Sequence, residues 1–393
     1  MRSLLLLVAF SAAACAQSLS GLWDAAVTVN GLEIPFRIEL SADGASAKGS
    51  FFNGDQKVTS TSGRFEDGRL ALTFDYMDTH LDAEWKDGAL AGKYGRPGRE
   101  YPFRARRFIP SKLTEGDVPR VAGLWEVETR SPKGEAAWRF IVRQSGPEVS
   151  AAILRVDGDT GVIEGGWRDG RFVLSHFDGA RPLLLEVKPQ PDGSLELTQN
   201  GRVKLKAVRS ADARAQGLPE PTDPSRHTSV KDPSEPLHFR FPDLAGRVVS
   251  DADPRFRGKV VIVSIGGSWC PNCRDEAPFL VDLYRQYHSR GLEVVLLSFE
   301  EAEQLKDPAR LRAFIKQYEV PYPVLLCGET GELNAKMPQA VNLNSWPTTF
   351  FLGRDGRVRS VHAGYAAQAT GEFHDRLKDD VKELIEKLLA EGL

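Results

Sequence analysis

Residues 264–280 read SIGGSWCPNCRDEAPFL and hold two cysteines, Cys270 and Cys273, three positions apart. A nearly continuous apolar run at residues 260–265 leads into this motif, and residues 274–290 carry apolar side chains at helical spacing. The pattern therefore predicts a buried strand that delivers the cysteine pair to the start of a helix.

A helix N-terminus suits a reactive cysteine. Its unpaired backbone N–H groups and the helix dipole favour negative charge, and so favour the thiolate form of Cys270. Cys273 lies one turn later on the same face, so the two sulfurs can close a small disulfide. Pro271 is accepted in a first helical turn and stiffens it. We expect Trp269 to shield one side of the disulfide.

Residues 237–393 alternate strand and helix patterns, which indicates an α/β domain. The runs at residues 260–265 and 294–299 are apolar on both faces, which is typical of a parallel sheet covered by helices, so we predict that these two strands lie in such a sheet. The predicted strands are residues 260–265, 294–299, 322–327, 348–352 and 358–363, and a closing helix covers residues 373–389.

Three motifs follow in order: WCPNC at 269–273, RDEAP at 274–278 and WPTTFFLGRDGRV at 346–358. Together they resemble the thioredoxin-fold domains of the TlpA/ResA type, which are envelope-located thiol-disulfide oxidoreductases. The resemblance covers residues 237–393. It implies protein thiols and disulfides as substrates, an upstream electron donor as a further partner, and reductase activity.

The resemblance also implies roles for single residues. Cys270 would be the exposed nucleophile, Cys273 the resolving cysteine and Pro347 a cis-proline beside the disulfide. Glu276 matches the glutamate of the family's R-x-E-x-P run and would assist as an acid/base group near the sulfurs.

This chain departs from the family pattern at two places. Trp346 stands before the proline, where a smaller residue is usual, and residues 266–268 are Gly-Gly-Ser in place of bulkier residues. Both departures concern partner docking more than the chemistry. We expect Trp269, Pro271 and Trp346 to contact the substrate protein.

Other interpretations of the cysteine pair are a zinc site and a structural disulfide. Structural zinc needs four protein ligands, but Cys327 is the only further cysteine after the N-terminal segment, and no second C-x-x-C or H-x-x-x-H occurs. A disulfide that closes so short a loop constrains little of the unfolded chain. A redox-active pair without metal or cofactor is therefore favoured, and Cys327 has no assigned role.

Two other functions remain alternatives. A peroxiredoxin-like peroxidase has a related fold, but the threonine that such enzymes carry three residues before the nucleophile is absent, because position 267 is glycine. The second alternative is a binding protein whose β repeats carry the main role and whose redox domain has degenerated. Intact Cys270, Cys273 and Pro347 argue against that degeneration.

The N-terminal half contains a tandem duplication. GLW at residues 21–23 recurs at 123–125, and GRFEDGRLAL at 63–72 matches GGWRDGRFVL at 165–174, both at an offset of 102 residues. Apolar and polar residues alternate in both copies, and Asp-Gly pairs suited to hairpin turns separate the runs. We predict two all-β units, sandwich or barrel-like, over residues 20–108 and 118–210.

The GLW opening is similar to the G-x-W that begins lipocalin-type barrels. A simpler interpretation makes Trp23 and Trp125 core residues at the start of a first strand. Between the second repeat and the α/β domain, residues 211–236 contain five prolines and few large apolar side chains, which is typical of an extended linker.

The first residues are typical of an export signal, with Arg2, an apolar run at residues 4–10 and small residues up to Ala16. We predict a signal peptide over residues 1–16 and a periplasmic or envelope-associated product. Cleavage after Ala16 would leave a soluble protein, whereas a lipobox-like interpretation makes Cys15 a lipid anchor. Both interpretations stay open.

Charge and hydropathy exclude two further classes. The 51 basic and 54 acidic residues give a formal net charge of −3, which offers no basic footprint for nucleic acid. After the export signal no apolar stretch reaches the roughly 20 residues of a membrane helix. We therefore expect no nucleic-acid partner and no transmembrane helix in the mature chain.

Overall fold

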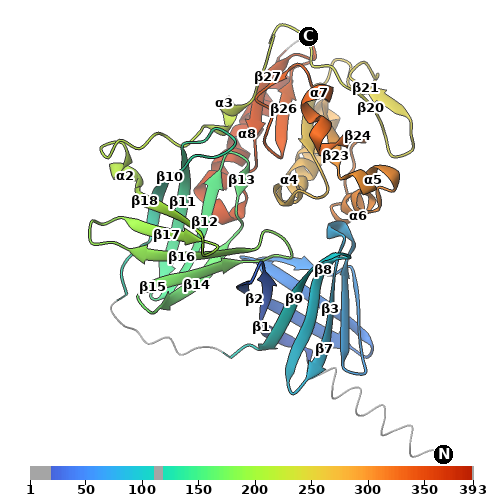
Figure 1. Ribbon diagram of the computed structural model, residues 1–393. Helices are drawn as coiled ribbons and strands as arrows, with labels where there is room; N and C mark the ends of the chain where they lie inside the picture. Colours follow the sequence, from blue (N-terminus) through green and yellow to red (C-terminus); the bar gives the residue numbers. More distant parts are fainter. Residues whose placement is uncertain (1–18, 110–117, 392–393) are drawn as a thin grey trace, which may run out of the picture. The chain divides into compact units, whose positions relative to one another are not determined.

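The computed structural model describes residues 19–109 and 118–391. The predicted export signal and Cys15 lie outside the described residues. In Figure 1, strands dominate the blue to green part of the chain, and strands mix with helices in the yellow to red part. By the density of its contacts, the chain divides into two compact units. One unit consists of Glu126–Ile141, Ile153–Asp159 and Ser210–Leu393, and the other contains the rest of both β repeats.

The first β repeat is a closed barrel. Eight antiparallel strands form a ring in the order β2-β1-β9-β8-β7-β6-β5-β3, with β3 paired back to β2 and β4 added beside β3. The strands are β1 (Gly21–Val29), β2 (Leu32–Asp43), β3 (Ser46–Asn53), β4 (Gln56–Thr59), β5 (Ser62–Glu66), β6 (Arg69–Phe74), β7 (Thr79–Lys86), β8 (Ala89–Arg96) and β9 (Arg99–Arg107). Asp67 and Asp87 have positive φ and precede glycines with positive φ, as type I′ hairpin turns require.

The second repeat has the same topology, with the ring β11-β10-β18-β17-β16-β15-β14-β12 closed by β11 against β12 and extended by β13. Its strands are β10 (Gly123–Glu128), β11 (Ala137–Ser145), β12 (Glu148–Arg155), β13 (Gly158–Asp159), β14 (Ile163–Arg168), β15 (Arg171–His176), β16 (Leu183–Pro189), β17 (Leu195–Gln199) and β18 (Val203–Arg209). The prediction of two all-β repeats is confirmed, and both are barrels.

Matching contacts in the two barrels reproduce the sequence repeat. Trp23 and Trp125 are both buried, as expected of core residues at the start of a first strand. The guanidinium of Arg107 lies 4.8 Å from the ring centre of Trp23, and that of Arg209 lies 3.9 Å from the ring centre of Trp125. Each arginine stands on the last strand of its barrel, so the same cation–π contact ties the first strand to the last in both copies.

The predicted linker is partly ordered. It contains the short helices α2 (Ser210–Ala213) and α3 (Pro224–His227) and the short strand β19 (Ser229–Val230), which pairs with β25 (Ala340–Val341). Asp223 caps α3 by accepting a hydrogen bond from the backbone N–H of Ser225. No helix in the described part of the chain combines the length and the apolar character needed to span a bilayer.

The C-terminal domain is built on a five-stranded sheet in the order β24-β23-β22-β26-β27. Its strands are β22 (Val260–Gly266), β23 (Leu292–Glu300), β24 (Val324–Glu329), β26 (Thr348–Leu352) and β27 (Val358–Ala363). The parallel arrangement predicted for the first two strands is confirmed for β22 and β23, and β24 continues it. β26 runs antiparallel to β22, and β27 is antiparallel to β26, so β27 points in the same direction as β22. A tight turn at residues 353–357 joins these last two strands as a hairpin.

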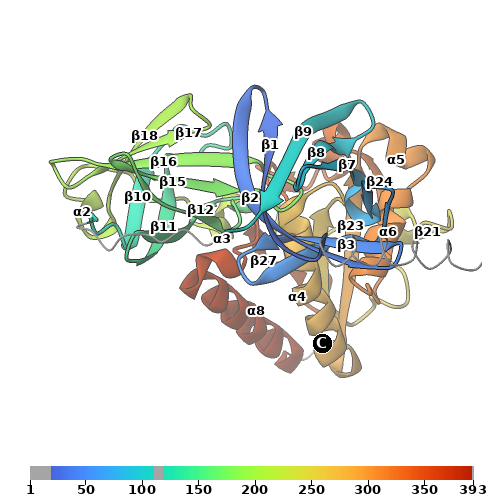
Figure 2. The same ribbon diagram turned by 90° about the horizontal axis from the view of Figure 1, so that it is seen from below.

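Helices and a small hairpin cover the two faces of this sheet. The helices are α4 (Pro271–Tyr287), α5 (Ala302–Lys306), α6 (Ala309–Gln317), α7 (Leu333–Lys336) and α8 (Glu372–Ala390). Apolar side chains of α4, α6 and α8 pack on one face, along which α4 and α8 extend (Figure 2). The other face packs against α7 and the hairpin of β20 (Arg240–Pro242) and β21 (Val248–Ser250). The thioredoxin-like fold expected from the sequence is present, and α4 starts directly after Cys270.

Candidate active site

The cysteine pair lies at the helix start that the sequence predicts. Cys270 is the N-cap of α4, and its Sγ accepts a hydrogen bond of 3.2 Å from the backbone N–H of Cys273. Both residues are thiols here, and both are buried, with exposed fractions of 3% and 6%. The exposed Cys270 that the family resemblance implies is therefore not observed.

The last residue of β22, Gly266, leaves space for the sulfur of Cys273. A Cβ at Gly266 would lie 3.1 Å from Cys273 Sγ, so glycine lets the sulfur pack against the strand. In the pairing of β22 with β26, Ile265 stands opposite Thr348. Pro347 therefore lies at the same end of the sheet as Gly266, and the peptide bond before Pro347 is cis, as the resemblance implies.

Glu276 is buried in the first turns of α4. Its two carboxylate oxygens accept hydrogen bonds from Ser264 Oγ at 3.0 Å and Thr349 Oγ1 at 2.8 Å. Burial raises the pKa of Glu276 to about 7, and the two hydroxyl groups only partly oppose this. Burial also raises the pKa of the Cys273 thiol well above its ordinary value, and the neighbouring Cys270 and Glu276 raise it further.

Glu276→Gln is expected to flatten the pH dependence of stability. The ordinary pKa of the carboxyl is 4.5, and the folded value is about 7, so the folded state binds more protons between these pH values. The free energy of unfolding of the wild type therefore falls as pH rises from about 4.5 to about 7, by about 3 kcal/mol. Urea unfolding across this range measures the effect. Glu303→Gln on exposed α5 is the control, and identical slopes for wild type and Glu276→Gln would contradict a raised pKa.

Two tryptophans form an aromatic wall beside the motif. Trp269 donates a hydrogen bond of 2.9 Å from Nε1 to the backbone oxygen of Phe299. The rings of Trp269 and Trp346 meet edge to face, with centres 5.4 Å apart. Pro271 occupies the first position of α4. The tertiary structure thus brings Trp346 against Trp269, which precedes Pro271 by two residues, and all three residues predicted to contact a substrate protein are partly exposed.

A buried polar network behind Ser268 was missed by sequence reasoning. Glu300 accepts hydrogen bonds of 2.7 Å from both the backbone N–H and the Oγ of Ser268. Arg310, fully buried, donates to Ser268 Oγ at 2.8 Å and pairs with Glu300 at 3.0 Å. This network holds the segment that leads into Cys270. The available signal was a carboxylate that directly follows the apolar run of residues 294–299.

Cys327 is separate from the cysteine pair. It lies on β24, two strands away from β22 in the sheet order, and is buried in the core on the face opposite α4. Burial raises the pKa of its thiol well above the ordinary value, so this cysteine is poorly reactive. Among the residues that the structure describes, no group of three or more His, Cys, Asp or Glu side chains is placed to hold a metal ion.

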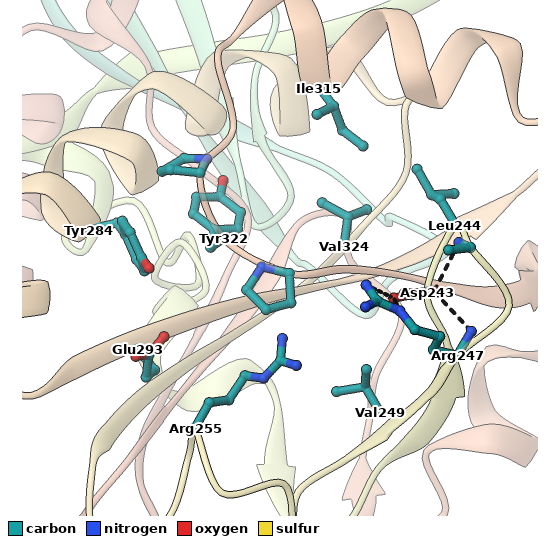
Figure 3. Close-up of a pocket in the computed structure, with 13 residues that line it drawn as sticks. Asp243, Leu244, Arg247, Val249, Arg255, Tyr284, Glu293, Ile315, Tyr322 and Val324 are labelled. Atoms are coloured by element: carbon teal, nitrogen blue, oxygen red, sulfur yellow. Dashed lines mark hydrogen bonds and ion pairs between the residues drawn. The ribbon is translucent and has the colours of Figure 1, made fainter.

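A cavity of about 530 Å³ opens elsewhere in the C-terminal domain (Figure 3). Its lining includes Arg247, Arg255, Tyr284, Glu293 and Tyr322, and Arg247 is tied to Asp243 by an ion pair. No residue of the WCPNC motif lines it. The cavity is therefore distinct from the cysteine site.

Comparisons with known proteins concern the C-terminal domain. Residues 235–361 match the AhpC/TSA family. Thiol-disulfide oxidoreductase ResA of Bacillus cereus (strain ZK / E33L) is 29% identical over 124 residues, which cover 32% of this chain and 65% of that protein. ResA of Bacillus subtilis (strain 168) is 27% identical over 147 residues, which cover 37% of this chain and 74% of that protein. The chain thus spans just under two thirds of the first relative and about three quarters of the second.

Among solved structures, a thiol:disulfide interchange protein of the thioredoxin family from Chlorobium tepidum TLS is similar at 25% identity. The match covers 41% of this chain and all of that chain, with a TM-score of 0.31. The sheet order, the helix-capping cysteine pair and the ResA relatives agree. The C-terminal domain is a thioredoxin-fold domain similar to thiol-disulfide oxidoreductases of the ResA type.

Proposed function

We propose that this protein is an extracytoplasmic thiol-disulfide oxidoreductase that reduces disulfides in partner proteins. The observation that carries the proposal is the Cys270–Cys273 pair at the start of α4, with Glu276 buried behind it. The names of the ResA relatives support the activity. The export signal predicted over residues 1–16 supports the location, either as a soluble protein or with a lipid on Cys15.

The proposed reaction passes two electrons and two protons to the partner. The Cys270 thiolate attacks one sulfur of the partner disulfide, so that a mixed disulfide forms and the partner's other sulfur leaves as a thiolate. The Cys273 thiolate then attacks the Cys270 sulfur, which releases the second partner thiolate and leaves a Cys270–Cys273 disulfide. A dithiol protein acting as upstream electron donor restores the pair by the same exchange.

Glu276 is proposed to accept the proton that Cys273 must lose before it attacks. A carboxyl with a pKa of about 7 suits this task, because a base works best when its pKa lies near the operating pH. The Glu276 carboxyl is buried close enough to Cys273 to raise the pKa of the Cys273 thiol. In the reverse direction it returns the proton. Trp269, Pro271, Trp346 and Pro347 are proposed to form the docking surface for the substrate.

The direction of electron flow is tested by the reduction potential of the full-length protein. We expect a value near that of thioredoxin, about −270 mV, because a cysteine pair with a low reduction potential readily donates electrons to a partner disulfide. Equilibration with glutathione or dithiothreitol buffers, followed by trapping of free thiols, measures the potential. A value near that of DsbA, about −120 mV, would rule out the reductase and leave an oxidase.

A peroxidase is a second candidate, because residues 235–361 match the AhpC/TSA family. The position of the threonine expected in such an enzyme is occupied by Gly267. A Cβ there would lie 2.4 Å from the backbone oxygen of Phe299 and 2.4 Å from Trp269 Nε1, so this position has no room for a threonine side chain. The geometry therefore favours disulfide exchange over peroxide reduction.

A further inference from the structure

The hairpin between β12 and β13 in the second barrel packs on the cysteine motif. Asn272, which lies between the two cysteines, donates a hydrogen bond of 2.6 Å from Nδ2 to the backbone oxygen of Asp157. The carboxylate of Asp159 accepts a hydrogen bond of 2.6 Å from the backbone N–H of Ala367. Residues 153–159 belong to the same compact unit as the C-terminal domain. The hairpin is thus tied both to the motif and to the loop after β27.

At this contact, the backbones of the hairpin and of the loop after β27 lie too close together for a side chain at Gly158 or at Gly364. Gly158 has φ +113°, and a Cβ on it would lie 2.6 Å from the backbone oxygen of Tyr365 and 2.7 Å from Asn272 Nδ2. On the facing loop, a Cβ at Gly364 would lie 2.4 Å from the backbone carbon of Asp157. Both contacts depend on glycine, so the hairpin fits this surface closely.

The facing loop also reaches the proline of the site. The backbone N–H of Gly364 donates a hydrogen bond of 2.7 Å to the backbone oxygen of Pro347. The hairpin therefore contacts the cysteine motif directly at Asn272 and is linked to Pro347 through Gly364. Cys270 has an exposed fraction of only 3%, although thiol exchange requires access to the attacking sulfur.

The corresponding hairpin of the first barrel differs at the contacting positions. At the offset of 102 residues, Gly158 corresponds to Gln56 and Asp159 to Lys57. Lys57 is exposed and pairs with Glu39 on its own barrel, and β4 runs for four residues where β13 has two. The second copy thus carries a glycine and a carboxylate at the places where it meets the redox domain. These features serve that contact, because the equivalent barrel turn forms without them.

We propose that residues 156–159 form a cover over the cysteine pair, and that this cover must leave Asn272 before a disulfide reaches Cys270. The inference rests on the proposed exchange reaction. While the cover is closed, Cys270 reacts slowly with small disulfides and small alkylating reagents. A protein substrate that binds Asn272 and the Gly364 backbone in its place opens the site, so the cover favours protein partners over small disulfides.

The cover is tested by the rate at which iodoacetamide alkylates Cys270 in the fully reduced, full-length protein. Gly158→Ala pushes the hairpin off Tyr365 and Asn272, and we expect alkylation to become about tenfold faster. Asn272→Ala removes the hydrogen bond to Asp157, and we expect about a fivefold increase. Gly146→Ala is the matched control, because this glycine of the same barrel also has positive φ but nothing within 4 Å of its Cβ position. We expect its rate to equal that of the wild type.

Rates are compared at their high-pH limit, where they no longer change with pH, so that the comparison reports access to the sulfur. Equal limiting rates in wild type, Gly158→Ala and Asn272→Ala overturn the cover. If Gly158→Ala does not fold by circular dichroism, Asn272→Ala, at a partly exposed site, decides alone. Failure of the proposed function has a different signature, since the wild-type pair would then form no reversible disulfide in redox buffers, whatever its alkylation rate.

Discussion

Cys270→Ser is expected to lower the rate of protein disulfide reduction by about 10³-fold or more, a loss typical of removing a covalent nucleophile. Serine keeps the helix cap but cannot form the mixed disulfide. Cys273→Ala is expected to fail differently. Its Cys270 still attacks, but no thiol resolves the product, so a covalent complex with the partner accumulates. Free-thiol assays on a disulfide-bonded protein substrate measure the first effect, and nonreducing gels of cell extracts show the second.

Cys327→Ala is the matched control for both cysteine variants, because Cys327 is equally buried but lies two strands away from β22. We expect it to retain exchange and to trap no partner. Trapping by Cys270→Ala in place of Cys273→Ala would reverse the two roles. Full activity in both variants of the pair would remove the cysteine motif from the reaction.

Arg310→Met is expected to lower the free energy of unfolding of the C-terminal domain by about 3–5 kcal/mol. Arg310 has no exposed side-chain surface, and its partner Glu300 is equally buried. Methionine fills a similar volume but leaves the Glu300 charge unpaired in the core, which is the costly step. Urea unfolding followed by tryptophan fluorescence measures the loss, since Trp269 and Trp346 lie beside this network.

Arg312→Met on the same helix provides the control. Arg312 is about half exposed and pairs with Asp307 at the surface, so its loss should cost less than about 1 kcal/mol. Equal losses of unfolding free energy in the two variants would show that the buried Arg310–Glu300 pair contributes no more to stability than the exposed Arg312–Asp307 pair. Because Ser268 is held by Glu300 and Arg310 and lies two residues before Cys270, we also expect Arg310→Met to slow exchange in whatever fraction remains folded.

Much of the candidate site was predictable because it depends on local patterns. An apolar strand, a helical period and the proline after Cys270 place the pair at a helix start, and these signals involve neighbours within a few residues. The motif order around Pro347 carried the family resemblance. The antiparallel direction of β26 was not predictable in this way, because an apolar run is the same in parallel and antiparallel strands.

The burial of Cys270 was also beyond the sequence. A thiol at a helix N-terminus can face solvent or turn inward, and residue type does not distinguish these orientations. Here Cys270 Sγ accepts the backbone N–H of Cys273, and Asp157 lies against the neighbouring Asn272. Both contacts depend on how the chain packs around the motif.

By itself, the sequence determined the duplication, the all-β character of both copies, the thioredoxin-like domain and its cysteine pair. Only the tertiary structure decided that β1 meets β9 to close the first barrel, that Arg310 meets Glu300, and that Asn272 meets Asp157. Asn272 and Asp157 stand 115 residues apart, so their contact arises from packing over the whole unit. Arginine and glutamate ordinarily remain in water, and only the enclosure of both by β23, α6 and the Ser268 segment pairs them inside the core.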